Sequence, residues 1–259
     1  MKQSKAVVSE RRKKLMEIVQ KTGDVRVPDI AQHLQVSEIT VRRDLQYLED
    51  RHVIERYYGG ARVVSEKATA LRDRVSVARE MIARYAAEQV MDGETIFINT
   101  SSTALMAVRY ITAKDVTIVT NNGNIVTSSH TPPHVTIILL GGELRNIKGT
   151  MVGEFTMHNL ARVKADRAFI GCTAVNLESG MMTQFLNEVD INRNMLRQTT
   201  GTAYILADHT KIGEESNFVS CETDLIKNII TDAYADAEAL EMFRERGIRM
   251  HIAGTEEIV

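Results

Sequence analysis

The stretch IAQHLQVSEITVRRDLQYLEDRHVIERYYGGARVV, residues 30–64, decides how the N-terminal part of the chain folds. It begins with the end of one apolar helix and continues, after a tight turn, into a second helix. Ser37 stands where the second helix would begin and is a residue type that caps helix N-termini. Val41, Leu45 and Leu48 then recur at the spacing that places apolar side chains on one helix face. The pattern predicts a helix-turn-helix.

The outer side of the second helix is polar and carries two arginines, which is the kind of surface that the DNA major groove accepts. The segments VIERYY and ARVV on either side of Gly59–Gly60 predict a β-hairpin, which beside a helix-turn-helix would be a wing. A solvated charged face is the alternative for the arginines alone, but the hairpin and the cap together favour DNA binding. The candidate DNA contacts are Ser37, Glu38, Thr40, Arg42, Arg43, Gln46, Arg56 and Tyr58.

The chain has 259 residues, of which 44% are hydrophobic, so it is too long for a winged helix alone and apolar enough for a second core. Residues 1–64 hold 13 Lys and Arg against 9 Asp and Glu, a net charge of +4, so the remainder carries −6 of the total of −2. Only the basic part is expected to meet a polyanion. Residues 65–77 are polar and charged. We therefore expect domains at 1–64 and 78–259, a linker between them, and a helix that begins near Val77.

Nothing in the sequence predicts a membrane protein or a metal protein. No stretch approaches the roughly 18 uninterrupted apolar residues of a transmembrane helix, and the N-terminus lacks the apolar core of a signal peptide. Cys172 and Cys221 are far apart and form no CxxC motif, so we expect free thiols in or near the core. The sequence therefore predicts a cytoplasmic protein without a metal site or a cofactor.

Short apolar runs recur from residue 95 onward and alternate with segments of helical periodicity, such as ALMAVRYI and EVDINRNMLRQT. This alternation indicates an α/β fold with a mostly parallel sheet that helices cover on both faces. The expected strands are TIFI (95–98), VTIVT (116–120), VTIILL (135–140), RAFIG (167–171), AYILAD (203–208), NIIT (228–231) and RMHI (249–252).

Ligands of open α/β sheets bind beyond the carboxyl ends of the strands, so the residues after each apolar run are candidate binding residues. Hydroxyl residues 101–103 follow the first run at an expected helix N-terminus, a position that favours anions. Lys211 follows a later run, and amides, Thr173 and Arg145 follow others. This set suits a small phosphorylated ligand with many hydroxyls. Taken singly, each residue has a structural alternative: a helix cap, a tight strand exit or a solvated lysine.

Over nearly its whole length the chain resembles the DeoR family of transcriptional regulators. The resemblance rests on VSEITVRRDLQYLE with HVIERYYGGA, and then on VTNN, LLGGELR, MVGE, GMMTQFLNE and ADHTKIG. It implies an N-terminal winged helix-turn-helix and a C-terminal sensor whose fold resembles ribose-phosphate isomerases. The implied function is repression of a sugar-catabolism operon by binding of double-stranded operator DNA, with control by a phosphorylated sugar.

The resemblance also assigns residues by position. Ser37, Thr40, Arg42 and Arg43 would contact the operator, and Ser102, Thr103 and Lys211 would belong to the effector site. Where the family's first sensor loop usually has Asp-x-Gly-Ser-Thr, this chain has Asn99-Thr100-Ser101-Ser102-Thr103, so we expect a different ligand selectivity. The full set of candidate effector residues is Asn99, Ser101, Ser102, Thr103, Asn121, Gly142, Arg145, Thr173, Asn187, Glu188, Asp208 and Lys211.

A sugar-phosphate isomerase with a DNA-binding head is the alternative function, with Glu188, Asp208 and Lys211 as candidate acid–base groups. The Lys-Gly-x-Gly-Gly type motif associated with those isomerases is absent, and fold analogy alone is weak support for catalysis. A single winged helix contacts only a short half-site, so a symmetric pair is the usual way to reach specificity. We therefore expect a homo-oligomeric regulator, a dimer or a tetramer, and not an enzyme.

Overall fold

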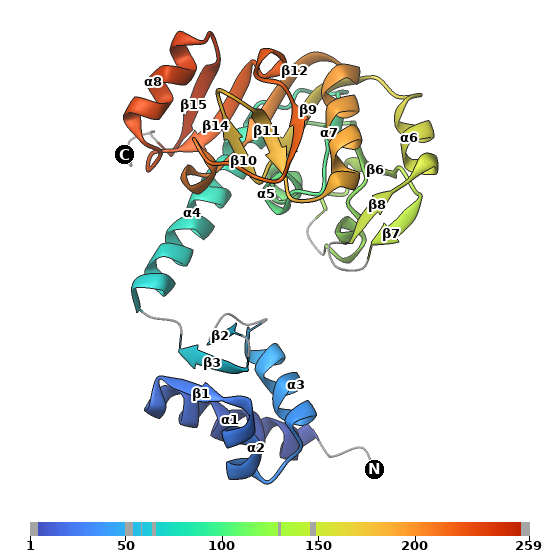
Figure 1. Ribbon diagram of the computed structural model, residues 1–259. Coiled ribbons are helices and arrows are strands. Elements are labelled where there is room, and N and C mark those ends of the chain that lie inside the picture. Colours follow the sequence, from blue (N-terminus) through green and yellow to red (C-terminus); the bar gives the residue numbers. More distant parts are fainter. Residues whose placement is uncertain are drawn as a thin grey trace. The chain divides into compact units, whose positions relative to one another are not determined.

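The computed structural model describes residues 5–49, 54–57, 59–63, 66–128, 131–145 and 149–254. The chain divides into two compact units, Met1–Asp73 and Arg74–Val259 (Figure 1). Helix α4, Glu66–Glu88, runs across the division, so that its first turns belong to the first unit and the rest to the second.

The N-terminal unit contains the expected helix-turn-helix. Gln35 ends the first of its two helices in a left-handed conformation, with φ of 52°. The Ser37 hydroxyl then accepts a hydrogen bond of 3.3 Å from the backbone N–H of Thr40, which satisfies a donor that the start of the second helix leaves open. The described elements are α1 (Lys5–Thr22), β1 (Asp24–Arg26), α2 (Val27–Leu34), α3 (Glu38–Glu49), β2 (Ile54–Tyr57) and β3 (Gly60–Val63).

The expected hairpin is also present, with one correction. Strands β2 and β3 pair antiparallel, and β3 pairs on its other side with β1. Gly60 lies opposite Tyr57 and belongs to the strand, whereas the sequence placed it in the turn. A side chain at Gly60 would collide with the Tyr57 ring and the Val25 carbonyl, so only glycine permits this close packing.

A buried ion pair joins α1 to α3, the second helix of the helix-turn-helix. Asp44 is only 1% exposed. Its two oxygens lie 2.5 Å from Nε of Arg11 and 2.8 Å from Nε of Arg12. The Arg12 guanidinium also stacks 3.5 Å from the centroid of the Tyr47 ring. The carboxylate therefore fixes the orientation of α3 on α1, while Leu15, Val41 and Leu45 form the apolar core around it.

The second unit is built on a seven-stranded parallel sheet with the strand order β15-β14-β12-β9-β4-β5-β6. All seven expected strands are confirmed. From β4 the chain adds β5 and β6 on one side, then returns to the other side of β4 and adds β9, β12, β14 and β15. The strands are β4 (Thr95–Ile98), β5 (Val116–Thr120), β6 (Val135–Leu139), β9 (Ala165–Gly171), β12 (Thr199–Leu206), β14 (Asn228–Asp232) and β15 (Arg249–Ala253).

Helices cover both faces of this sheet, as expected (Figure 1). Alternate residues of one strand serve opposite faces. Ile96 and Ile98 pack with α4 and α5, whereas Phe97 between them packs in the core of the other face. The helices of the first face are α4 and α5 (Ser102–Ala107), and those of the second are α6 (Glu154–Leu160), α7 (Leu186–Gln198) and α8 (Ala237–Glu245).

The structure corrects two further expectations. Helix α4 begins at Glu66 and not near Val77, so most of the segment expected to be a linker is helical. Two small antiparallel sheets were not expected, because strands of three or four residues show no periodicity that separates them from loops. They consist of β7 (Glu143–Arg145) with β8 (Thr150–Val152), and of β10 (Ala174–Asn176), β11 (Gly180–Thr183) and β13 (Phe218–Cys221). Among the described residues, no helix is long and apolar enough to cross a membrane.

Replacing Asp44 by asparagine is expected to destabilise the N-terminal unit. The neutral amide keeps the volume but loses two charge-assisted hydrogen bonds, each of which typically contributes about 1.5–3 kcal/mol, and the arginines recover part of this by turning to solvent. We expect a loss of about 2 kcal/mol in the free energy of unfolding, measured by hydrogen exchange of α1 and α3. Glu17→Gln, at an exposed position of α1, is the control and should be neutral. Equal protection in both variants would contradict the assigned role.

Candidate functional site

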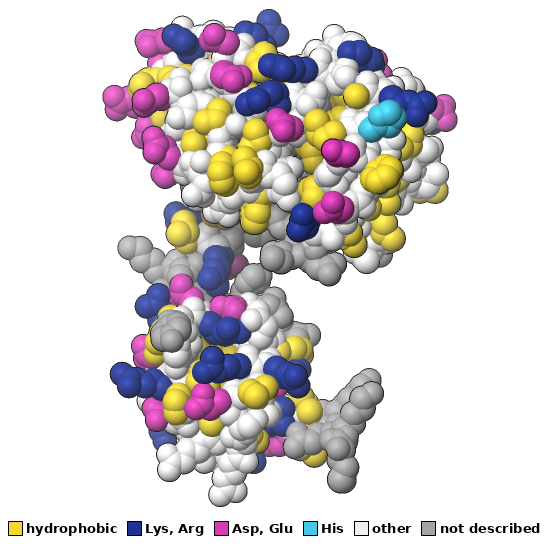
Figure 2. Space-filling view, turned by 45° about the vertical axis from the view of Figure 1, so that its right-hand side comes forward, with side chains coloured by type: hydrophobic (Ala, Val, Ile, Leu, Met, Phe, Trp, Pro, Cys, Tyr) yellow, Lys and Arg dark blue, Asp and Glu magenta, His cyan; other side chains and the backbone are white. Residues whose placement is uncertain are grey.

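The predicted DNA contacts of α3 form a polar surface on the solvent side of that helix, and Lys and Arg side chains are spread over the face of the first unit that Figure 2 shows. Glu38, Arg42, Arg43 and Gln46 are exposed, and Thr40 is half-buried. Arg42 is held by an ion pair of 3.2 Å to Glu38, one helical turn earlier. Arg43 makes no hydrogen bond or ion pair with any residue in the described ranges. Two adjacent arginines thus differ, one restrained and one free.

The wing is tied to this surface through Arg56. Its Nη1 donates a hydrogen bond to the Gln46 side chain, and its Nε lies 3.7 Å from the Glu49 carboxylate. The predicted contact Tyr58 lies outside the described residues. Ile39 is not among the predicted contacts, although it is 66% exposed in the first turn of α3 and its place off the buried face can be read from the sequence.

The second unit contains a pocket of about 380 Å³ at the carboxyl ends of the sheet strands. It lies beside the ends of β4 and β9, the neighbours between which the direction of strand addition reverses. Such a switch point is where open α/β sheets bind ligands, because the connections leave in opposite directions. The predicted residues that line it are Asn99, Ser101, Ser102, Thr173, Glu188 and Lys211, and the unpredicted ones are Arg79, Thr100, Asn124, Gly171, Cys172 and Thr183.

Three other predicted effector residues have structural roles near the strand ends. Thr103 is buried in α5. Asn121 is buried after β5, and its amide donates a hydrogen bond of 3.1 Å to the Met151 carbonyl. Gly142 has a φ of +109° and approaches Thr156 so closely that a side chain would collide with it. Gly142 therefore serves the tight exit from β6.

Arg145 and Asn187 do not line the pocket either. Arg145 is exposed on β7 and pairs with Glu143 at 3.2 Å. Asn187 is exposed in the first turn of α7, next to the buried pocket residue Glu188. Because neighbouring residues of a helix point about 100° apart, only one of these two can face the pocket.

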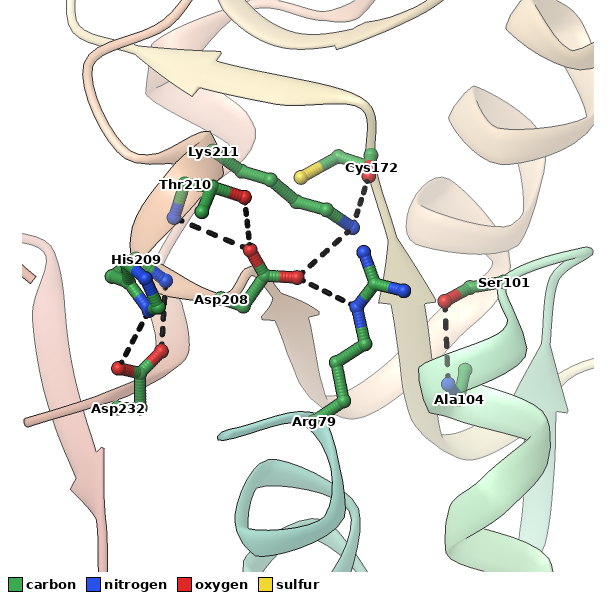
Figure 3. Close-up of polar contacts among 9 residues, drawn as sticks. All are labelled: Arg79, Ser101, Ala104, Cys172, Asp208, His209, Thr210, Lys211 and Asp232. Atoms are coloured by element: carbon green, nitrogen blue, oxygen red, sulfur yellow. Dashed lines mark hydrogen bonds and ion pairs between the residues drawn. The ribbon is translucent and has the colours of Figure 1, made fainter. Parts of the chain in front are cut away.

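Asp208, the last predicted residue outside the pocket lining, is a fully buried carboxylate beside it (Figure 3). Its Oδ2 lies 2.9 Å from Nε of Arg79 and 3.9 Å from Nζ of Lys211. Its Oδ1 accepts hydrogen bonds from the backbone and hydroxyl of Thr210. Burial alone would raise the pKa of Asp208, but the Lys211 ammonium, the Thr210 hydrogen bonds and Arg79 together lower the pKa below its ordinary value. The group is therefore an anion at neutral pH.

Lys211 is positioned by two groups rather than free in solvent. Besides the ion pair with Asp208, its Nζ donates a hydrogen bond of 2.8 Å to the Cys172 carbonyl at the end of β9 (Figure 3). An ammonium has three donors, so a ligand can still receive one. Burial raises the pKa of the Cys172 thiol to about 11, so that side chain stays neutral at physiological pH.

Asn99 joins the two strands at the switch point. Its side-chain oxygen accepts a hydrogen bond of 3.0 Å from the Gly171 backbone N–H, and its amide donates one of 2.8 Å to the Gly171 carbonyl. The amide donates a second bond of 2.9 Å to Asn192 of α7. The side chain thus continues the pairing of β4 with β9 where the backbones separate. An aspartate could not donate either bond.

Glu188 is the acidic side chain of the pocket lining, and hydroxyls hold it in place. Oε1 accepts a hydrogen bond of 3.0 Å from Thr100, and Oε2 accepts one of 2.7 Å from Thr183. The carboxylate comes from α7, whereas its two partners come from the β4 loop and from β11. A ligand in the pocket would meet an acceptor whose orientation is already fixed.

One pair of histidines has a spacing that some zinc sites use. His130 and His134 form an HxxxH pattern around two prolines, and His130 lies outside the described residues. The His134 Nε2 lies 3.1 Å from the Ile111 carbonyl oxygen, so this ring already has a partner. Within the described ranges, no three metal-ligating side chains come together.

Asn99→Asp should destabilise the second unit. The variant removes the donor for the buried Gly171 carbonyl, while Asn192 can rotate its own amide to meet the new carboxylate. One buried unsatisfied carbonyl costs about 1–3 kcal/mol, and we expect a loss of this size in the free energy of unfolding by urea. Asn187→Asp makes the same chemical change at an exposed site and should be neutral. If the two variants were equally stable, the bridging role of Asn99 would be wrong.

Comparisons with known proteins match two family models to the chain. The family model described as the DeoR C-terminal sensor domain matches residues 75–233, and that of the DeoR-like helix-turn-helix domain matches residues 11–67. Partial structural similarity, at 14% identity in each case, extends to ribose 5-phosphate isomerase A of Methanocaldococcus jannaschii (TM-score 0.36, 51% of this chain and 52% of that chain) and eIF2B beta of Chaetomium thermophilum (TM-score 0.44, 63% and 51%).

Two curated relatives match over almost their whole lengths. The glycerol-3-phosphate regulon repressor of Escherichia coli is 27% identical over 94% of this chain and 98% of its own. The lactose phosphotransferase system repressor of Staphylococcus aureus is 30% identical over 91% of this chain and 96% of its own. With a helix-turn-helix of this family at its N-terminus and the sensor domain of the same family behind it, the chain belongs to the DeoR family of transcriptional regulators.

Proposed function

We propose that this regulator represses a sugar-catabolism operon in the cytoplasm and that a phosphorylated sugar, bound in the pocket at the β4–β9 switch point, controls it. The observation that carries the proposal is the chemistry of the pocket lining. Arg79 and Lys211 offer cationic donors, and the hydroxyls of Ser101 and Ser102 lie with them. The fixed Glu188 carboxylate suits sugar hydroxyls. The two curated relatives are named as repressors for glycerol 3-phosphate and lactose systems.

The same contacts support binding over catalysis. A general base needs a carboxylate that can reach a substrate proton. Asp208 is buried and engaged by Arg79, Thr210 and Lys211, and Glu188 has a hydroxyl on each oxygen. Asp208 is thus not available as a general base, and Glu188 is held in one position as a hydrogen-bond acceptor, which suits a sensor.

Arg42 and Arg43 should contribute to operator binding in different ways. Their side chains leave α3 about 100° apart, so we expect one to contact a base edge and the other a phosphate. Alanine at the base-contacting position should cost about 1–3 kcal/mol and relax specificity at one base pair. Alanine at the other position should weaken binding to all sequences and reduce the salt dependence.

The measurement is fluorescence anisotropy with operator and scrambled DNA at several salt concentrations. Arg162→Ala, which removes an exposed arginine from the second unit, is the control. Wild-type affinity of both Arg42→Ala and Arg43→Ala for both DNAs would disprove the assignment of α3 as the recognition helix.

We also propose that the protein is at least a dimer, because one winged helix covers only a half-site and symmetric pairs read two. The acidic, apolar-rich second unit is the expected assembly surface, because the basic first unit is expected to contact DNA. Light scattering of the full chain at micromolar concentration should give a mass of two or four chains. The mass of one chain would contradict the proposal.

Effector binding should depend on the phosphate and on Lys211. Charge-assisted hydrogen bonds are about twice as strong as neutral ones, so removal of the ammonium should sharply reduce affinity. Calorimetry should detect a phosphorylated sugar with the wild type, but not the free sugar, and Lys211→Met should bind poorly. By linkage, the ligand and the operator must change each other's affinity by the same factor. Equal binding of the free sugar, or a normal response of Lys211→Met, would show that the site is wrong.

A further inference from the structure

Arg79 connects the pocket with helix α4. It lines the pocket, and the other charged lining residues, Glu188 and Lys211, come from elements later in the chain. Its Nε donates a hydrogen bond of 2.9 Å to Asp208. Within the described ranges the two terminal nitrogens have no hydrogen-bond partner, and Figure 3 shows them on the side of the guanidinium that faces Ser101 and Cys172. Four of the five guanidinium N–H donors are therefore still available to a ligand.

The charges around Arg79 favour an anion at those free nitrogens. Arg79 and Lys211 are two cations that share one buried carboxylate, Asp208, so this cluster has a net positive charge. The Arg79 side chain is 37% exposed, whereas that of Lys211 is 16% exposed. A guanidinium can hold one carboxylate through Nε and a second anion through its terminal nitrogens, because its donors lie in one rigid plane.

Arg79 lies in helix α4, which contains the boundary between the two units. The helix runs without a break from Glu66 to Glu88, and its residues up to Asp73 belong to the unit that contains the helix-turn-helix. Beyond Arg79, the helix is anchored on the sheet by Ile82, Ala83 and Ala86, which are fully buried. A change in the Arg79–Asp208 ion pair thus acts on α4 near the N-terminal end of the segment that packs on the sheet.

We propose that Arg79 is the coupling residue of the sensor: an anionic group of the ligand takes its terminal nitrogens, alters its ion pair with Asp208, and so shifts α4. This inference rests on the proposed function, because it concerns the same pocket, and it adds the residue through which binding is transmitted. The rival interpretation is that the Arg79–Asp208 pair merely neutralises a buried charge. Loss of a purely structural pair would lower stability without selectively removing the response to ligand.

The test compares two quantities in each variant of the full chain. The first is the affinity for glycerol 3-phosphate, ribose 5-phosphate and inorganic phosphate, measured by calorimetry. The second is the factor by which each of these probes changes operator affinity, measured by anisotropy. The variants are Arg79→Met, which removes the charge, and Arg79→Lys, which keeps it. Arg84→Met is the matched control, since Arg84 lies on the same helix in an exposed ion pair with Glu80.

We expect Arg79→Met to bind the active probe at least tenfold more weakly. At saturating probe, its operator affinity should be nearly the same as without the probe. Arg79→Lys should recover part of the affinity but little of the response, because a compact ammonium does not bridge two anions as a guanidinium does. Arg84→Met should match the wild type. If Arg79→Met does not fold, Arg79→Lys decides by the same criterion.

Two negative results are distinguishable. A wild type that responds to a probe, with Arg79 variants that respond equally at saturation, overturns the coupling role and leaves the proposed function intact. A wild type whose operator affinity is unchanged by every phosphorylated probe overturns both. A variant that loses stability but keeps its full response assigns Arg79 to neutralisation of Asp208 alone and also overturns the inference.

Discussion

The pocket of the second unit depends on one buried carboxylate beside it. Asp208 follows strand β12 and is fully removed from solvent, so its charge is stable only if cations and hydrogen-bond donors meet it inside the protein. Arg79 from α4 and Lys211 from the short helix after β12 supply the cations, and Thr210 supplies the donors. This requirement brings α4 to the carboxyl edge of the sheet and concentrates positive charge beside the pocket.

The strand order of the sheet determines where the pocket lies relative to this cluster of charges. Because β9 returns to the side of β4 opposite β5, the loops after β4 and β9 separate, and the space between them is the pocket. The Asn99 side chain holds the ends of β4 and β9 together through two hydrogen bonds with the Gly171 backbone. Gly171 itself must be glycine, since a side chain there would collide with Ser101. Asn99, where the resemblance led us to expect an aspartate, thus has a structural role beside the pocket.

The N-terminal unit also contains a buried carboxylate that two cations neutralise. Its apolar core is small, and the buried Asp44 adds a directional contact that fixes α3 on α1 through Arg11 and Arg12. Arg42 and Arg43 remain exposed on the surface of α3, where they are accessible to DNA. Asp44 is buried, whereas its sequence neighbours Arg42 and Arg43 are exposed. This difference arises because successive residues of a helix point about 100° apart.

The sequence alone determined the helix-turn-helix, the wing, the seven strands of the main sheet and half of the pocket lining, because these features depend on local periodicity and on which residues follow a strand. Only the tertiary structure identified Arg79, which the chain holds 129 residues away from Asp208. It likewise separated Glu188 from its neighbour Asn187 and assigned Gly142 to packing. Short strands such as β10 and the true start of α4 also lack a periodic signal. Strand order and burial determine which side chains of different elements come into contact. The spacing of residues along one element does not reveal either property.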